Sequence, residues 1–140
     1  MRKAIIGGLA VMLMAATGGA QAAADAVGVW KTPTNGEVEI FHCGPDLCGR
    51  LLNSPRLKTD PGLKDIKNKD AGQRGRTLKG MVFITGFKGG PPTWSDGKLY
   101  NPEDGNTYAG SITLQANGAL QLKGCAAVVL CKTQVWARIR

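Results

Sequence analysis

The chain has a single histidine among its 140 residues, so the commonest catalytic base is nearly absent. This residue, His42, shares an alternation face with Val38 and Ile40, where a lone histidine is expected to pack rather than to catalyse. No motif surrounds any serine, and the cysteines cannot supply a thiolate if they form disulfides. Glu103 and Asp104 remain as a carboxylate pair, although adjacent acidic residues before a glycine are first of all turn formers. The sequence therefore indicates no catalytic residue.

Helical patterns and long apolar runs are also lacking after residue 22. No window there shows a convincing apolar period of about 3.6 residues. Glycine and proline, with 20 and 7 residues in the whole chain, interrupt almost every window. No later stretch offers the roughly 20 apolar residues that a membrane-spanning helix takes. These absences argue against a helical bundle and against a transmembrane segment.

The N-terminus has the pattern of a secretory signal peptide. Arg2 and Lys3 form a short positive region, residues 4–16 carry no charge, and the small-x-small sequence ends at Ala22. The apolar run is too short for a membrane anchor, and no cysteine stands nearby to be modified with lipid. We therefore expect a signal helix that is cleaved after Ala22, with Ala24 as the alternative site.

Cleavage after Ala22 predicts a signal peptide over residues 1–22 and one domain over residues 23–140. The product would be periplasmic or secreted. Its four cysteines are an even number, which in an exported protein is typical of disulfides.

Each pair of neighbouring cysteines flanks a reversal of the chain. Cys43 and Cys48 enclose a Gly-Pro-Asp turn, and Cys125 and Cys131 enclose the short apolar stretch 126–130. Local pairing is therefore predicted, with each short loop contributing roughly 2 kcal/mol in the chain-entropy model. The alternatives are crossed pairing and a four-thiolate zinc site, whose ligands usually stand about two to four residues apart.

Strand signals occur along the whole remaining chain. Turn-forming pairs stand at Asn35-Gly36, Asp96-Gly97, Asp104-Gly105 and Asn117-Gly118. Between the turns, alternating or short apolar stretches predict strands over residues 28–30, 37–40, 48–52, 81–87, 98–101, 107–115, 119–124 and 132–139. Eight or nine short strands joined mostly by tight turns predict an all-β domain, an antiparallel up-and-down barrel. A β-sandwich is the alternative.

Positive charge is concentrated in residues 50–79, which we call the basic segment. It contains three aspartates and nine basic residues, which are Arg50, Arg56, Lys58, Lys64, Lys67, Lys69, Arg74, Arg76 and Lys79. Removal of residues 1–22 lowers the formal net charge from +8 to +6, and the basic segment carries all of that excess. One interpretation is a solvated, partly disordered connection. The other is a binding surface for an anion, with Lys64, Lys67, Lys69, Arg74 and Arg76 as its candidate residues.

Nucleic acid is a poor partner for the basic segment, because the segment contains no aromatic side chain on which a base could stack. The stretch 101–106 is similar to a calcium-binding loop, but its glycine, Gly105, stands at position 5 rather than position 6 of the pattern. A hairpin turn is favoured there. No metal or other cofactor is expected.

Several motifs together resemble the bacterial secreted family catalogued as domain of unknown function 2147. They are Gly28-Val29-Trp30, Cys43-Gly44 with Leu47-Cys48-Gly49-Arg50, Asp65-Ile66-Lys67-Asn68, the stretch 99–108, and Leu122-Lys123-Gly124-Cys125 with Gln134-Val135-Trp136. The resemblance implies a lipocalin-like (calycin) barrel and brings no established activity or catalytic residue.

A Gly-x-Trp at the first strand and an arginine near the end of the last are similar to the lipocalin pattern. There, a cation lies over the tryptophan ring and plugs one end of the barrel, a contact worth about 0.5–2 kcal/mol. Trp30 with Arg138 or Arg140 is predicted to close the barrel in this way.

Two functions from different classes follow. The first is an exported, noncatalytic binding protein for a small amphiphilic or anionic partner. The second is an envelope accessory protein that acts through its basic surface without a ligand cavity. An enzyme of unknown type is third, and the pattern indicates no particular oligomeric state.

Overall fold

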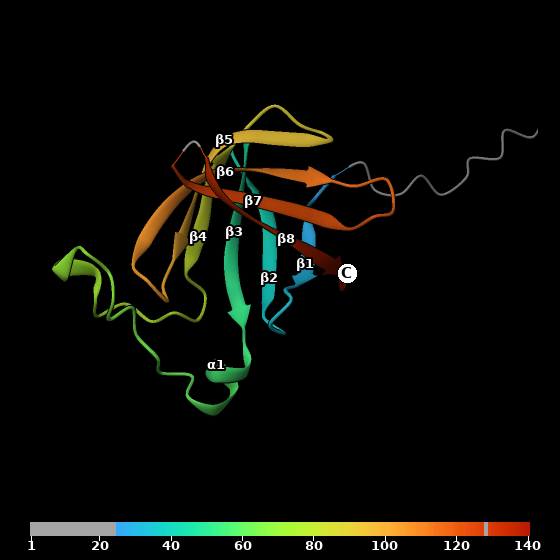
Figure 1. Cartoon of the computed structure of the whole chain (residues 1–140). Coiled ribbons are helices and arrows are strands. Elements are labelled where there is room, and N and C mark those ends of the chain that lie inside the picture. Colours follow the sequence, from blue (N-terminus) through green and yellow to red (C-terminus); the bar gives the residue numbers. More distant parts are fainter. Residues whose placement is uncertain (1–24, 128) are drawn as a thin grey trace, which may run out of the picture.

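The computed structural model describes residues 25–127 and 129–140; the predicted signal peptide and both cleavage positions lie outside them. The described residues form eight antiparallel strands that follow one another around a closed barrel (Figure 1). The strands are β1 (Gly28–Lys31), β2 (Glu37–Cys43), β3 (Asp46–Asn53), β4 (Val82–Phe87), β5 (Thr93–Asn101), β6 (Asn106–Leu114), β7 (Leu120–Ala127) and β8 (Leu130–Arg138). The predicted up-and-down barrel is confirmed.

A short helix, α1 (Pro55–Thr59), and a 3₁₀ turn, η1 (Ala71–Gln73), lie in the connection between β3 and β4. No helix in the described part of the chain is long and apolar enough to cross a membrane. In a meander, alternate connections lie at the same end of the barrel. The β3–β4 connection therefore shares one end with the β1–β2, β5–β6 and β7–β8 turns, and we call this the connection end.

The barrel closes where the two ends of the described chain meet. β1 pairs with β8, with Trp30 opposite Arg138. Beyond that pair, the Val29 N–H donates to the Arg140 carbonyl at 2.7 Å, and the Ile139 N–H donates to the Val29 carbonyl at 2.8 Å. These bonds join the first strand to the last. Because β1 is short, the residues of β8 before Ala137 have no partner in β1.

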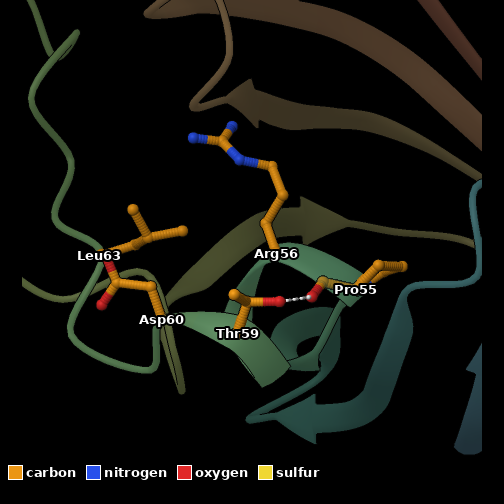
Figure 2. A pocket seen from close by; sticks show the side chains of 5 residues that line it. All are labelled: Pro55, Arg56, Thr59, Asp60 and Leu63. Atoms are coloured by element: carbon orange, nitrogen blue, oxygen red, sulfur yellow. Dashed lines mark hydrogen bonds between the residues drawn. The ribbon is translucent and has the colours of Figure 1, made fainter.

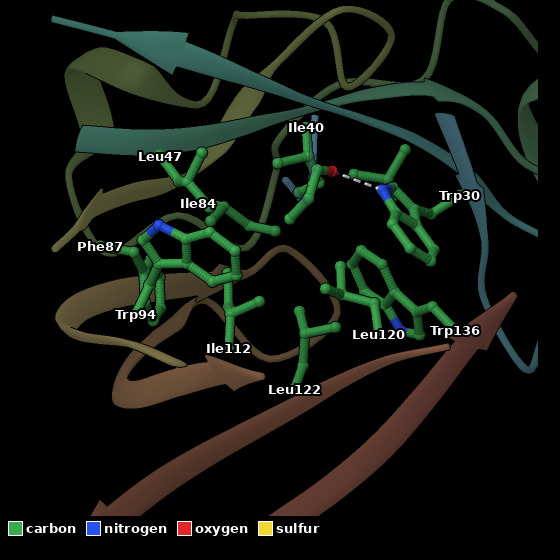
Figure 3. Packing of buried hydrophobic residues seen from close by; sticks show 12 residues of the cluster. Trp30, Ile40, Leu47, Ile84, Phe87, Trp94, Ile112, Leu120, Leu122 and Trp136 are labelled. Atoms are coloured by element: carbon green, nitrogen blue, oxygen red, sulfur yellow. Dashed lines mark hydrogen bonds between the residues drawn. The ribbon is translucent and has the colours of Figure 1, made fainter. Parts of the chain in front are cut away.

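Apolar side chains fill the interior of the barrel (Figure 3). The cluster contains Ala26, Trp30, Val38, Ile40, Leu47, Ile84, Phe87, Trp94, Ile112, Leu120, Leu122 and Trp136, each 5% exposed or less. Glycines make room for the largest of them. A Cβ on Gly97 would overlap the ring of Phe87, and one on Gly49 would lie 2.8 Å from Cδ1 of Ile84. The interior is thus a packed core rather than an open ligand chamber.

One predicted turn is wrong. Asp96-Gly97 was expected to join two strands, but both residues lie inside β5, at a register shift between Trp94 and Gly97. Asp96 takes a left-handed φ of 63° there, which makes a bulge rather than a reversal. The pair is needed in the strand because Gly97 faces Phe87 in the core, a contact that the local sequence does not reveal.

The cysteines pair locally, as the turns predict. Cys43 and Cys48 form one disulfide, with Cα atoms 5.9 Å apart, and Cys125 and Cys131 form the other, with Cα atoms 4.0 Å apart. Each bond joins neighbouring strands across a hairpin, β2 to β3 and β7 to β8.

Candidate functional site

The basic segment is folded, not a disordered connection. It leaves β3 through Ser54, whose hydroxyl accepts the Leu57 N–H at 3.2 Å and caps α1. Pro55 starts the helix, where its missing N–H does no harm. Leu57 is the buried residue of this helix. The Ser-Pro pair is a local helix-start signal that the strand-based interpretation did not use.

A buried carboxylate then anchors the segment. The Asp65 side chain is fully buried, and its Oδ1 accepts the Tyr100 hydroxyl of β5 at 2.6 Å. Its Oδ2 accepts the Asn68 amide at 2.8 Å and Nε of Arg76 at 3.0 Å. The Arg76 guanidinium also lies 5.5 Å from the centre of the Tyr100 ring. Four side chains therefore lock the segment onto the barrel wall; we call them the Asp65 anchor.

These contacts shift the protonation equilibria of the anchor. Burial raises the pKa of Asp65, but the hydrogen bonds from Tyr100, Asn68 and Arg76 outweigh it, so the pKa lies below its ordinary value. Burial, followed by the hydrogen bond to the Asp65 carboxylate, raises the pKa of Tyr100 to about 12. Asp65 is therefore charged and Tyr100 neutral at physiological pH, which is the state that the hydrogen bonds require.

A second contact joins the segment to the β5–β6 turn. Lys69 Nζ donates to Oδ1 of Asn106, and the Tyr108 hydroxyl donates to Asp104. Gly105, with φ of 72°, lies so close to the Lys67 carbonyl that a Cβ there would overlap it. Burial raises the pKa of Asp104, and the hydrogen bonds from Tyr108 and Asn106 lower it further than burial raises it.

The side chains of the β5–β6 turn hold the turn itself. Oδ1 of Asn101 accepts the Glu103 N–H at 2.9 Å, and Oδ1 of Asp104 accepts the Asn106 N–H at 2.8 Å. Within the described residues, no three His, Cys, Asp or Glu side chains are grouped so as to hold a metal ion. This arrangement is that of a hairpin turn.

The five candidate binding residues do not converge on one site. Arg76 belongs to the Asp65 anchor, and Arg74 Nε donates to the Asn68 carbonyl at 2.7 Å. Lys69 is engaged with the β5–β6 turn. Lys64 and Lys67 are exposed, and their ammonium groups make no hydrogen bond or ion pair with any described residue. Three of the five side chains thus hold the segment in place, and two face solvent.

A pocket lies beside α1, where the basic segment begins (Figure 2). It is a shallow hollow, largely open to solvent, with a volume of about 470 Å³, and it is lined by Pro55, Arg56, Thr59, Asp60 and Leu63. The Thr59 hydroxyl donates to the Pro55 carbonyl at 3.3 Å. The Arg56 guanidinium makes no hydrogen bond or ion pair with any described residue. Its charge is therefore free to meet a ligand.

At the opposite end, Arg138 lies over the ring of Trp30, with 4.3 Å between the guanidinium carbon and the ring centre. The same guanidinium donates to the Val27 carbonyl at 2.9 Å and to the Asp25 carbonyl at 2.8 Å. Arg140 contributes its backbone carbonyl, not its side chain, to this end. Of the two predicted arginines, Arg138 is the one placed against the ring.

His42 differs from its expectation. It was predicted to pack, yet 54% of its side chain is exposed, and its Nε2 lies 2.9 Å from Oδ2 of Asp25. Burial raises the pKa of Asp25, but the hydrogen bond from His42 and the backbone bonds outweigh it and lower the pKa. The buried alternation of β2, with Val38 and Ile40 inside, stops before His42, whose side chain lies beside Asp25 instead.

The model of a bacterial family, "Uncharacterized protein conserved in bacteria (DUF2147)", matches residues 28–138. The chain belongs to this family. A search of curated proteins finds no match.

One solved structure is similar to this member of the DUF2147 family. It is protein HP1028 from the human pathogen Helicobacter pylori, described as belonging to the lipocalin family. The two share 24% sequence identity with a TM-score of 0.75, over 83% of this chain and 84% of that one. At this identity the likeness shows the fold, which is lipocalin-like.

The motifs of the DUF2147 resemblance contain three of the four anchor residues, Asp65, Asn68 and Tyr100, to which the sequence analysis assigned no role, whereas Arg76 was predicted to bind an anion and instead pairs with Asp65. Asp65 and Asn68 stand in one motif and Tyr100 in another, 35 residues further along. The position of Asp65 among many basic residues could have indicated that it pairs with one of them. Its buried partner on β5 was not visible without the fold.

Proposed function

We propose that the protein is an exported, noncatalytic binder whose pocket beside α1 takes a small amphiphilic anion. The observation that carries this proposal is the free Arg56 guanidinium beside the apolar walls of Pro55 and Leu63. An anionic head group would pair with Arg56, and a short apolar tail would lie against the proline and leucine.

The packed core supports a site outside the barrel. The barrel interior is occupied by its own apolar side chains, including three tryptophans. The Asp65 anchor keeps the residues after α1 in place, so the pocket wall at Leu63 is ordered before a ligand arrives. Preorganisation of this kind favours binding, because less conformational freedom is lost.

Export is part of the same proposal. Two disulfides within a small domain are compatible with an oxidising compartment, and the N-terminal pattern predicts the route. We place the protein in the periplasm or outside the cell.

The test is titration of the purified protein with a fluorescent fatty acid. Arg56→Ala should weaken binding about tenfold, because a charge-assisted hydrogen bond contributes about 1.5 kcal/mol or more. Lys58→Ala is the matched control, since Lys58 is an exposed cation of the same helix that does not line the pocket. Affinity of the parent should also fall as salt rises. Equal affinities for the parent and Arg56→Ala would contradict the proposal.

A second candidate function is contact with an anionic envelope component through Lys64 and Lys67. Both ammonium groups are exposed without a partner among the described residues, which favours a surface role. Replacing both lysines with glutamine should weaken retention on an anionic matrix and leave fatty-acid binding unchanged. Unchanged retention on the anionic matrix would contradict this second function.

A further inference from the structure

The β7–β8 hairpin extends beyond the barrel wall as a two-stranded ribbon. On one side, β7 pairs with β6 no further than Cys125. On the other, β8 pairs with β1 only from Ala137 onward. Residues 130–135 of β8 are consequently all exposed, on both faces of the strand. Figure 1 shows β7 and β8 as neighbouring strands of this hairpin.

A disulfide stands where barrel packing ends. Two-stranded ribbons are marginal in water by themselves, because they have no core to bury. Cys125 and Cys131 face each other in the register, and their bond joins the two strands at the base of the tip. The cross-link keeps the ribbon paired without help from the barrel.

The tip is apolar. Val129 is 85% exposed and Leu130 is 66% exposed, while Ala126 and Ala127 are exposed beside them. Of the large apolar side chains in the described residues, only Ile66 matches these exposures, at 71%. Apolar side chains gathered at a projecting point mark an interaction site.

The charge around the tip identifies the partner. Residues 105–140 contain no aspartate or glutamate. Lys123 and Lys132 are exposed on the two strands of the ribbon. A second copy of the chain would bring its own lysines against these, and the like charges would oppose contact. An anionic lipid bilayer satisfies both features, since acyl chains take up the apolar tip and head-group phosphates pair with the lysines.

We propose that the β7–β8 ribbon is a membrane-docking finger that inserts Val129 and Leu130 into an anionic bilayer. The inference rests neither on the pocket beside α1 nor on Lys64 and Lys67. It adds an interaction surface at the connection end of the barrel. The disulfide keeps the finger stiff, and the lysines confine insertion to negatively charged membranes.

Vesicle sedimentation tests the finger. The exported protein, with its N-terminus checked by mass spectrometry, is mixed with vesicles of equal parts phosphatidylcholine and phosphatidylglycerol. The double variant Val129→Ser with Leu130→Ser should bind at least about tenfold more weakly. Lys132→Gln should weaken binding about fivefold. Val135→Ser is the matched control, because Val135 is 51% exposed on the same strand but away from the tip.

Fluorescence provides a second readout. The three native tryptophans are 5% exposed or less, so a tryptophan introduced by Leu130→Trp reports on the tip. Its emission should shift to the blue on anionic vesicles and be quenched by brominated lipid. Arg56→Ala should leave vesicle binding unchanged, which separates this inference from the proposed pocket.

Four results would overturn the inference. They are equal vesicle binding by the parent and the double variant, an equal loss in Val135→Ser, an unshifted Leu130→Trp emission, and equal binding to pure phosphatidylcholine. If gel filtration shows that the double variant abolishes self-association instead, the partner is a second copy, and the membrane proposal fails.

Discussion

Replacing Asp65 with asparagine should release the part of the basic segment after α1 while the barrel stays folded. The carboxylate accepts hydrogen bonds from Tyr100, Asn68 and Arg76, and its side chain is fully buried. Hydrogen bonds to charged groups contribute about 1.5–3 kcal/mol each. Asparagine keeps one acceptor oxygen, and Arg76, 38% exposed, can return to water. We therefore expect a loss of about 2–4 kcal/mol in the local stability of the segment.

Limited trypsin digestion measures this release, because the segment contains many lysines and arginines. Cleavage tracks the population of the opened form when closing is faster than cutting. A loss of about 2–4 kcal/mol raises that population roughly 30-fold to several hundred-fold. Mass spectrometry should place the early cuts after Lys64, Lys67 and Lys69. Circular dichroism should show that the barrel remains.

Asp60→Asn is the control for this experiment. It makes the same chemical change in the same segment, but at an exposed carboxylate that accepts only the Gly62 N–H. Its digestion rate should equal that of the parent. If Asp65→Asn is also digested at the parent's rate, the anchor does not hold the segment, and the account of its energetics is refuted.

Three further predictions concern the anchor, the core and the closed end. The pKa of Asp65 is lower in the folded state than in the unfolded state, so its contribution to stability is complete above the unfolded pKa and is lost as pH falls through the folded pKa. In urea unfolding, the free energies of unfolding of the parent and Asp65→Asn should therefore converge at acid pH. Gly97→Ala should lower the free energy of unfolding by about 3 kcal/mol, because the added Cβ overlaps the ring of Phe87. Adding Phe87→Leu to this variant should recover part of the loss. An unchanged midpoint of urea unfolding in Gly97→Ala would contradict the packed interior. Arg138→Gln should lower the free energy of unfolding by about 2 kcal/mol, since it removes a cation–π contact and two hydrogen bonds, whereas Arg140→Gln should have little effect. Equal losses in the two variants would remove the special role of Arg138.

Much of the fold was predictable because its contacts are local. Seven of the eight strands are joined to the next along the chain, so the meander follows from turn residues and two-residue alternation. Asn35-Gly36 and Asn117-Gly118 mark reversals directly. The disulfides span separations of only 5 and 6 residues, and a single turn brings each pair together.

The wrong expectations share a physical cause, which is that distant residues decide them. Asp96-Gly97 reads as a turn locally, but Gly97 is held in a strand because Phe87 of the neighbouring strand needs the space of a side chain. The alternation of β2 predicts that His42 is a core residue, but its side chain is exposed and lies beside Asp25, 17 residues away.

The sequence by itself indicated a meander of eight or nine strands, favoured local disulfides and showed where the positive charge is concentrated. Tertiary structure decided what that charge does. Arg76 is paired with Asp65, 11 residues away, and Asp65 is paired with Tyr100, 35 residues away. Arg56, by contrast, makes no hydrogen bond or ion pair with any described residue. Arg76 and Arg56 therefore look alike in the sequence but differ in role. Local pattern sets how the chain turns, whereas pairing across the barrel depends on which strands become neighbours, and only the closed fold establishes that.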